Sequence, residues 1–231
     1  MDLYTKTETV QQDIDKDFIA SIFQPENVDV ILSKSTTVKY RKRETVIKSG
    51  EFVSHLILIY KGFVKVEIEK GKRNLILDIV PAMNIIGLPV VLNLAKYDFS
   101  IVSLTECEVR LLPIDTIKSI ISGNGKVAMQ IINYANDQFV FPMLNKLQCI
   151  SHNNVRGRLA QLLLNLAQNT HQSKSFTLFI SRTEMAEMIG FSRENVIRIL
   201  SEFHTENIIS ISGKNIEIKN FPKLEELARY S

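Results

Sequence analysis

The sequence predicts an α+β protein in which a β-sandwich or barrel, a long helix and a C-terminal winged helix follow one another. From Thr36 to Pro113 apolar residues recur with period two in short runs separated by glycines, which is typical of a sandwich or barrel. From Lys126 to Ile150 the period changes to that of a helix. Near the C-terminus two short helical patterns separated by Gly190 precede a hairpin pattern, which is the order of a winged helix.

Composition is that of an ordinary globular protein. The 231 residues are 45% hydrophobic and 23% charged, and the net charge of +3 gives no indication of a nucleic-acid partner. Because no apolar run could span a bilayer and the N-terminus is unlike a signal peptide, we expect a cytoplasmic protein with no membrane partner. Two cysteines, Cys107 and Cys149, are too few for a disulfide framework or a four-cysteine cluster.

The N-terminal residues Asp13–Ser33 are expected to form short helices that Pro25 interrupts. Their apolar face comprises Phe18, Ile19, Ile22 and Phe23. Strands follow from Thr36, and the last strand pair is expected at Ser100–Leu104 and Glu108–Pro113. These elements would form the first domain.

A long helix is expected after the strands. Asp115 is the expected cap of a short helix ending at Ile121, and Lys126–Ile150 is the longest helical run, with a kink at Pro142. Six residues at steps of three and four, all apolar except Asn136, form a seam similar to that of a coiled coil: Ile132, Asn136, Phe139, Met143, Leu147 and Ile150. Such a seam needs a partner, which is either another helix or the chain's own strands.

Two capped helices follow a short strand expected at Thr177–Ile180. Ser181 with Glu184 has the spacing of a capping box, Gly190 suits the end of the first helix, and Ser192 suits the start of the second. The expected inner faces are Met185, Met188 and Ile189 for the first helix, and Val196, Ile199, Leu200 and Phe203 for the second. This is the pattern of a helix-turn-helix, whose second helix enters the DNA major groove.

The outer face of the second helix carries Arg193, Glu194 and Arg198. Arginine can donate two hydrogen bonds to guanine, and glutamate can accept one from cytosine. The alternative is a solvated helix with an ion pair between Glu194 and Arg198. The hairpin pattern at Ile208–Ser212 and Ile216–Lys219 favours the DNA-binding interpretation, because a hairpin after a helix-turn-helix makes a winged helix.

The segment Gly190–Leu200, with Ile208–Ser210 and Gly213-Lys214 after it, resembles the DNA-binding domain of the Crp/Fnr family of bacterial transcription regulators. Its Arg-Glu-x-x-x-Arg order is similar to that of the catabolite activators and departs from the order in the Fnr branch. The resemblance implies base-reading by Arg193, Glu194 and Arg198. It implies phosphate contacts by Arg182, Ser192 and Lys214.

The segments Lys39–Glu51 and Ile59–Gly62 are similar to the cyclic-nucleotide-binding β-roll of the same family, so the resemblance covers about Ser35 to Asn220. It implies a β-roll effector domain over residues 1–125, a dimerisation helix over 126–151 and a winged helix-turn-helix over 152–231. It also implies a homodimer on a pseudo-palindromic double-stranded DNA site, with RNA polymerase as a partner.

The family's cyclic-AMP-binding members hold the ribose with a glutamate, the phosphate with an Arg-Ser pair and the base with a Thr-Ser pair. The corresponding positions here are Leu88, Tyr97, Asp98, Met143 and Leu144. No arginine lies between Arg73 and Arg110, so the bidentate phosphate partner is missing. We expect an effector other than cyclic AMP, unless Lys96 replaces the arginine. Three alternatives for this pocket remain open: it binds a hydrophobic molecule, it binds haem, or it is filled by its own side chains and binds no ligand.

Other chemistry has weak support. The histidines His55, His152, His171 and His204 share no metal-ligand spacing, so we expect no metal site. Haem stays open as a cofactor, because one histidine and one distant ligand suffice. Without a phosphate loop, nucleophile elbow or carboxylate pair, an enzyme is not expected. Two alternatives remain: a haem-dependent gas or nitrosative-stress sensor of the same family, and a ligand-binding module that acts on a protein partner.

Overall fold

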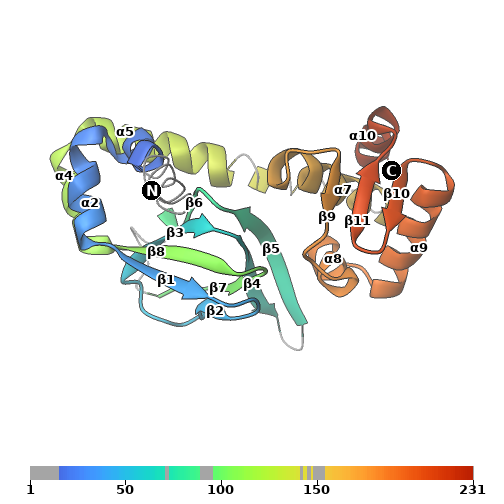
Figure 1. Ribbon diagram of the computed structural model, residues 1–231, viewed down its shortest axis with the longest axis horizontal. Coiled ribbons are helices and arrows are strands. Elements are labelled where there is room, and N and C mark those ends of the chain that lie inside the picture. The colour runs from blue at the N-terminus through green and yellow to red at the C-terminus, as the bar shows by residue number, and fades with distance from the viewer. Residues whose placement is uncertain are drawn as a thin grey trace, which may run out of the picture. The chain divides into compact units, whose positions relative to one another are not determined.

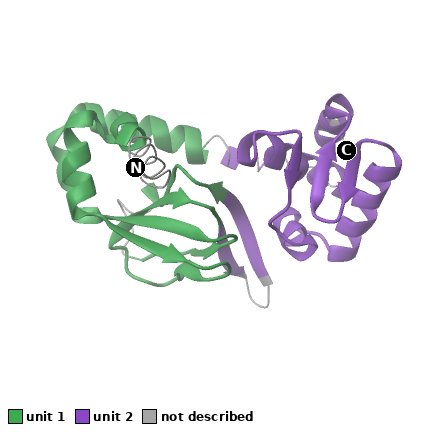
Figure 2. Ribbon diagram, viewed as in Figure 1, with its two compact units in different colours: residues 1–64, 80–141 green, residues 65–79, 142–231 purple. Residues whose placement is uncertain are grey.

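The computed structural model describes residues 16–70, 73–88, 96–140, 143–144, 147 and 154–230 (Figure 1). The chain divides into two compact units, residues 1–64 with 80–141, and residues 65–79 with 142–231 (Figure 2). The predicted kink at Pro142 and the residues Cys149, Ile150 and His152 lie outside the described residues. The domain boundaries expected from the sequence stay a prediction.

Two four-stranded sheets form the β-roll, with strand orders β1-β8-β3-β6 and β2-β7-β4-β5. The strands are β1 (Thr36–Tyr40), β2 (Thr45–Ile47), β3 (His55–Lys61), β4 (Phe63–Lys70), β5 (Arg73–Pro81), β6 (Asn84–Ile86), β7 (Ser100–Ser103) and β8 (Cys107–Pro113). β8 pairs antiparallel with both β1 and β3, which makes it a central strand of the first sheet. Gly62, between β3 and β4, has a φ of +89°, and a Cβ there would lie 2.3 Å from the Glu106 carbonyl oxygen. Only glycine fits this turn.

β3 is buried along both faces, whereas the sequence pattern predicted alternation. Leu56, Ile57, Leu58 and Ile59 are all fully buried. β3 lies between β8 and β6, and a strand covered on both faces carries a continuous apolar run. The period-two prediction was therefore right about the strand and wrong about its exposed face.

Helices pack beside the first sheet. They are residues 16–23, the 3₁₀ turn η1 (Pro25–Asn27), α2 (Val28–Lys34), α4 (Ile114–Gly123), α5 (Gly125–Ala135) and the π-helical η2 (Asn136–Val140). α2 and α4 both contact β8. The Ile85 amide donates to the Tyr134 hydroxyl at 2.9 Å, and burial raises the pKa of Tyr134 to about 12. This contact ties the end of α5 to β6.

Two predictions for the first unit are wrong in detail. β7 and β8 are not a strand pair: they belong to different sheets, because the connection at 104–106 carries the chain from one sheet to the other. Asp115 does not cap α4. It lies within the first turn, and the cap residue is Pro113, which has no side-chain hydrogen bond to offer. Asn124 caps α5, accepting from the amides of Lys126 and Val127.

In residues 154–230 of the C-terminal unit, α-helices pack against a small antiparallel sheet with strand order β10-β11-β9. Its elements are α7 (Val155–Asn165), the π-helical η3 (Leu166–Thr170), β9 (Ser175–Thr177), α8 (Arg182–Ile189), α9 (Arg193–Thr205), β10 (Ile209–Ser212), β11 (Asn215–Ile218) and α10 (Phe221–Tyr230). The strand predicted at Thr177–Ile180 is displaced: β9 ends at Thr177, where its pairing with Asn215 ends. Leu178 and Ile180 are nevertheless buried.

Candidate DNA-binding surface

α8 begins with the predicted capping box. The Ser181 hydroxyl accepts from the Glu184 amide at 3.2 Å, and the Glu184 carboxylate accepts from the Ser181 amide at 2.8 Å. Burial alone would raise the pKa of Glu184, but hydrogen bonds from Ser181 help to bring it below its ordinary value. The charged carboxylate also suits the positive N-terminal end of a helix.

The turn between α8 and α9 is fixed from both sides. Gly190 has a φ of +74° and ends α8 in the left-handed conformation, as predicted. The Arg158 guanidinium donates to the Ile189 carbonyl oxygen at 3.0 Å and lies over the Phe191 ring at 5.1 Å. α7 therefore holds the angle between the two helices of the helix-turn-helix.

α9 buries the face that the sequence predicted. The Ser192 hydroxyl accepts from the Asn195 amide at 3.3 Å and caps the helix. Its inner face consists of Val196, Ile199, Leu200 and Phe203, all buried. In α8 the corresponding residues Met185 and Ile189 are buried and Met188 is partly exposed.

Arg193, Glu194 and Arg198 are exposed on α9, so the three candidate base-reading side chains share the outer face of one capped helix. The ion pair considered between Glu194 and Arg198 is replaced by another: Arg198 pairs with Glu202 at 2.6 Å, one turn further on. The backbone amide of Glu194 and the Ser192 hydroxyl hold the pKa of the Glu194 carboxyl below its ordinary value. The Glu194 carboxylate therefore interacts with the backbone amide and the Ser192 hydroxyl at the start of α9, and Arg198 forms its ion pair with Glu202.

The three candidate phosphate-contacting residues differ in exposure. Ser192 and Lys214 are exposed, at the start of α9 and in the β10–β11 turn respectively. Arg182 is partly buried, and burial lowers the pKa of its guanidinium. Its Nη1 atom lies 3.4 Å from the Met185 sulfur. Arginine stays charged at neutral pH even so.

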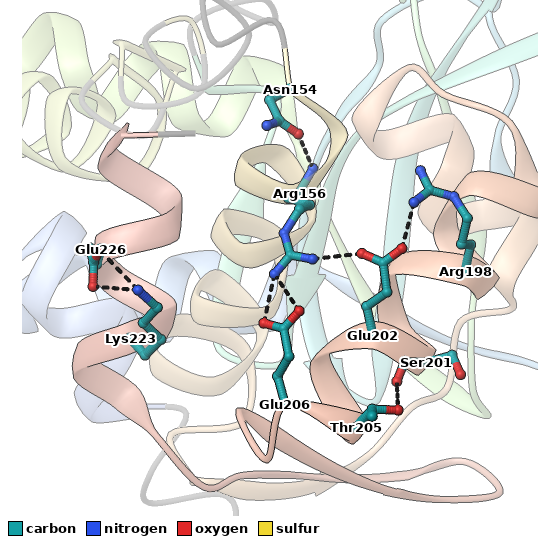
Figure 3. Close-up of polar contacts among 9 residues, drawn as sticks. All are labelled: Asn154, Arg156, Arg198, Ser201, Glu202, Thr205, Glu206, Lys223 and Glu226. Atoms are coloured by element: carbon teal, nitrogen blue, oxygen red, sulfur yellow. Dashed lines mark hydrogen bonds and ion pairs between the residues drawn. The ribbon is translucent and has the colours of Figure 1, made fainter.

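A charged network joins α7 to α9 (Figure 3). Arg156 donates to Glu202 at 2.6 Å and to both carboxylate oxygens of Glu206, at 2.9 and 2.7 Å. Glu202 also accepts from Arg198, so its carboxylate lies between the two guanidinium groups. This network was not predicted from the sequence. The i,i+4 spacing of Arg198 and Glu202 was the available signal.

Within the described residues, the side chains of the predicted seam are exposed or partly exposed. Ile132, Met143 and Leu147 are 51, 53 and 56% exposed, and Asn136 and Phe139 are partly exposed. Further exposed apolar residues that are not part of the predicted seam are Met129, Val140 and Leu144. Val127 and Ile131 are buried instead, so the opposite face of α5 packs within its own unit. Large exposed apolar patches indicate an interaction site.

The described histidines have local partners. His55 is hydrogen-bonded to Ser54, His204 lies 3.3 Å from the Ile209 carbonyl oxygen, and His171 stacks on Phe176. Burial lowers the pKa of His171. Within the described ranges, no group of three His, Cys, Asp or Glu side chains comes together in an arrangement that could bind a metal ion. The part of the chain that the structure describes also contains no helix with the length and apolar character needed to cross a bilayer.

Known proteins match both parts of the chain. Residues 157–227 match the Crp-like helix-turn-helix domain, and residues 37–124 match the cyclic nucleotide-binding domain. The cAMP-activated global transcriptional regulator CRP of Salmonella typhimurium is 31% identical over 194 residues, covering 78% of this chain and 88% of that protein. This chain belongs to the Crp/Fnr family.

Other members are similar over most of their length. The fumarate and nitrate reduction regulatory protein of Yersinia pestis is 25% identical over 211 residues, covering 88% of this chain and 82% of that protein. FixK2 from Bradyrhizobium japonicum has the same fold, with a TM-score of 0.77 at 20% identity, covering 85% of this chain and 98% of FixK2. This Crp/Fnr protein is a transcription regulator with a DNA-binding helix-turn-helix and a domain of the cyclic-nucleotide-binding type. Its relatives are likewise regulators.

In this Crp/Fnr regulator the five candidate effector positions do not share one environment. Leu88 and Tyr97 are buried in the β-roll, whereas Asp98, Met143 and Leu144 are exposed. The Tyr97 hydroxyl donates to the His55 carbonyl oxygen at 2.5 Å, and burial raises the pKa of Tyr97. The Tyr97 backbone is hydrogen-bonded to Gly50 and Glu51, which holds the ring in place. Residues 89–95, between Leu88 and Tyr97, lie outside the described residues.

Proposed function

We propose that this regulator acts as a homodimer that reads a pseudo-palindromic DNA site and responds to an effector other than cyclic AMP. The proposal that this protein reads DNA rests on the exposed outer face of α9, which includes Arg193, Glu194 and Arg198. These residue types match the donor and acceptor pattern of G·C pairs in the major groove. The N-terminal turns of a recognition helix are the part that contacts bases.

Positioning on the duplex would come from phosphate contacts. Lys214 in the wing and Ser192 at the start of α9 are exposed on the same unit, and Arg182 lies at the start of α8. Contacts of this kind fix orientation and contribute affinity but carry no sequence information. We assign these three residues to that role.

The proposed dimer rests on the exposure of three apolar residues of the predicted seam, Ile132, Met143 and Leu147. Their sequence spacing is that of a coiled-coil seam, and a symmetric pair of helices would cover these residues of each chain with the same residues of its partner. Under this proposal residues 126–151 form the dimerisation helix between an effector domain, residues 1–125, and a DNA-binding domain, residues 152–231.

The proposal that the effector is not cyclic AMP rests on the residues that we align with the family's cyclic-AMP-binding positions. Leu88 and the ring of Tyr97 fill buried space, and Asp98 would repel a phosphate. Activation by cAMP is stated in the name of the Salmonella relative, and we do not extend it to this chain. RNA polymerase is the partner that membership in this family of regulators suggests.

Selection of DNA from a random library with the purified protein tests the proposal. We expect an enriched site with two inverted half-sites, centred about one helical turn (about 10 base pairs) apart and each containing a G·C-bearing core. Light scattering of the free protein should give the mass of two chains. Enrichment of a single, non-repeated half-site would contradict the dimeric reading of DNA, and no enrichment at all would contradict the base-reading assignment.

A further inference from the structure

Glu202 occupies a position between two arginines with different roles. One carboxylate oxygen accepts from Arg156 at 2.6 Å, and the other accepts from Arg198 at 2.6 Å (Figure 3). Arg156 belongs to α7, whereas Arg198 stands on the outer face of α9. A single carboxylate therefore connects the scaffold of the domain with a side chain proposed to read bases.

Arg156 is well suited to hold Glu202 in place. Besides Glu202, it binds both carboxylate oxygens of Glu206, and its guanidinium lies 5.2 Å from the centre of the Phe203 ring. The hydrogen bond to Glu206 is the main cause that raises the pKa of Arg156. Since Arg156 is fixed by three neighbours, the Glu202 carboxylate is also restricted in position.

The consequence for Arg198 is a restricted orientation. Its Nη1 atom binds Glu202, and its Nη2 atom lies 3.5 Å from the Asn195 side-chain oxygen. A guanidinium has five N–H donors, so donors remain for a base edge. The negative charge of Glu202 disfavours the approach of a phosphate to the same guanidinium. An arginine without this neighbour would be free to swing onto the phosphate backbone of any sequence.

We propose that Glu202 is a positioning residue for DNA specificity, which, anchored by Arg156, directs Arg198 to base edges and keeps it from phosphates on non-cognate DNA. This inference rests on the proposed function, because it requires Arg198 to read a base. It adds a specificity-determining residue one turn beyond the three that were assigned from the sequence.

Glu206→Gln is the matched control for Glu202→Gln. Glu202 lies in α9 and Glu206 is the residue that caps its C-terminal end. Both substitutions remove one negative charge and one partner of Arg156, but of the two only Glu202 contacts Arg198. Dissociation constants are measured for the selected site and for a scrambled duplex of equal length and composition, over a range of salt concentrations. Both variants should bind all DNA more tightly, because each removes a negative charge.

Only Glu202→Gln should lower the ratio of specific to non-specific affinity, by about tenfold, which is near the lower end of one bidentate base contact. Selection from a random library should then show a relaxed preference at a single position of each half-site. In an Arg198→Ala background Glu202→Gln should leave the ratio unchanged, because the side chain it positions is gone. A variant that is only less stable would have a lower melting temperature but an unchanged ratio of specific to non-specific affinity.

The outcomes separate the two proposals. If Glu202→Gln and Glu206→Gln give the same ratio while Arg198→Ala still relaxes one base position, the positioning role is wrong and the proposed function stands. If Arg198→Ala leaves the base preference unchanged, the base-reading assignment of Arg198, on which this inference rests, is wrong, whereas the proposed function is contradicted only if the wild-type protein enriches no site. Arg156→Gln is a second route that leaves the Glu202–Arg198 pair intact. It should reduce the ratio by less than Glu202→Gln, and a ratio equal to that of the wild type contradicts the anchoring by Arg156.

Discussion

The β-roll and the winged helix differ at the positions where this family contacts its ligands. On α9 the side chains Arg193, Glu194 and Arg198 are charged and exposed. In the β-roll, Leu88 and Tyr97 stand where we align the nucleotide-binding residues of relatives, and both are buried. The proposed base-reading positions therefore carry the charged, exposed side chains that this role needs, whereas two of the five aligned effector positions, Leu88 and Tyr97, carry side chains buried in the β-roll.

This comparison between α9 and the β-roll indicates that DNA reading and effector binding can diverge separately in such a regulator. Base-reading side chains project from a helix and contribute little to packing, so their retention reflects the DNA that is bound. Residues that line a ligand site also belong to a core. In the alignment proposed above, Leu88 stands at the glutamate position and Tyr97 at the arginine position, so each replaces a polar binding group by a side chain that fills buried volume.

The largest expected effect is the loss of the proposed dimer, which would carry two copies of each region. Met143→Lys places a charge in the proposed dimer seam, and burial of an uncompensated charge costs about 3–5 kcal/mol. We expect the dimer dissociation constant to rise more than a hundredfold, measured by light scattering over a dilution series. Val30→Lys is the control, because Val30 is 44% exposed on α2 outside the seam. A Met143→Lys protein that remains a wild-type dimer would remove this helix from the interface.

Next in size is the loss of one base contact on the DNA-binding side. Arg193→Ala should cost about 1–3 kcal/mol on the selected site and relax the preference at one position of each half-site. The measurement is a binding selection repeated with the variant. The base-reading assignment of Arg193 is wrong if the enriched sequence is unchanged.

A phosphate contact should behave differently from a base contact. Lys214→Ala should weaken binding to every sequence alike and reduce the slope of log K against log salt by about 1. Titrations of the selected and scrambled duplexes at several salt concentrations give both quantities. A loss confined to the selected site would place Lys214 among the base-reading residues instead.

The capping box of α8 should show a pH dependence of stability. The folded-state pKa of Glu184 lies below its ordinary value of 4.5, so the ionised carboxylate stabilises the folded protein above that pH. The stabilisation is lost as the pH falls through the folded-state pKa. Glu184→Gln keeps a capping residue but cannot ionise, and should cost about 0.3–1 kcal/mol at pH 7.

Denaturant unfolding of the wild type and of Glu184→Gln at several pH values measures this effect. The two stabilities should converge as the pH falls below about 4.5. If the difference in unfolding free energy between the two proteins stays constant down to pH 3, the destabilisation by Glu184→Gln comes from packing and not from the charge of Glu184.

The smallest expected effect is the absence of a response to cyclic AMP. A ligand that binds only the folded state stabilises it by RT ln(1 + [L]/Kd), about 2.7 kcal/mol at a hundredfold excess over Kd. We expect no saturable rise in melting temperature with micromolar cyclic AMP. A saturable rise in melting temperature would show that this β-roll binds cyclic AMP although no arginine lies between Arg73 and Arg110. Lys96→Ala would then test whether Lys96 binds the phosphate in place of the arginine.

The local features of the helix-turn-helix could be predicted from the sequence. The Ser181–Glu184 capping box, the left-handed Gly190 and the Ser192 cap are all present as expected. Each depends on residues within four positions of one another, so the chain needs no distant partner to specify it. The buried face of α9 follows from the helical period for the same reason.

Tertiary structure decided the features that join distant parts of the chain. The burial of Ile57 and Ile59 depends on what covers β3, and the separation of β7 from β8 depends on how the strands pair across two sheets. Arg156 meets Glu202 only because α7 packs against α9, 46 residues later. A sequence pattern reports the period of one element, whereas the partner of a side chain is set by which elements pack together.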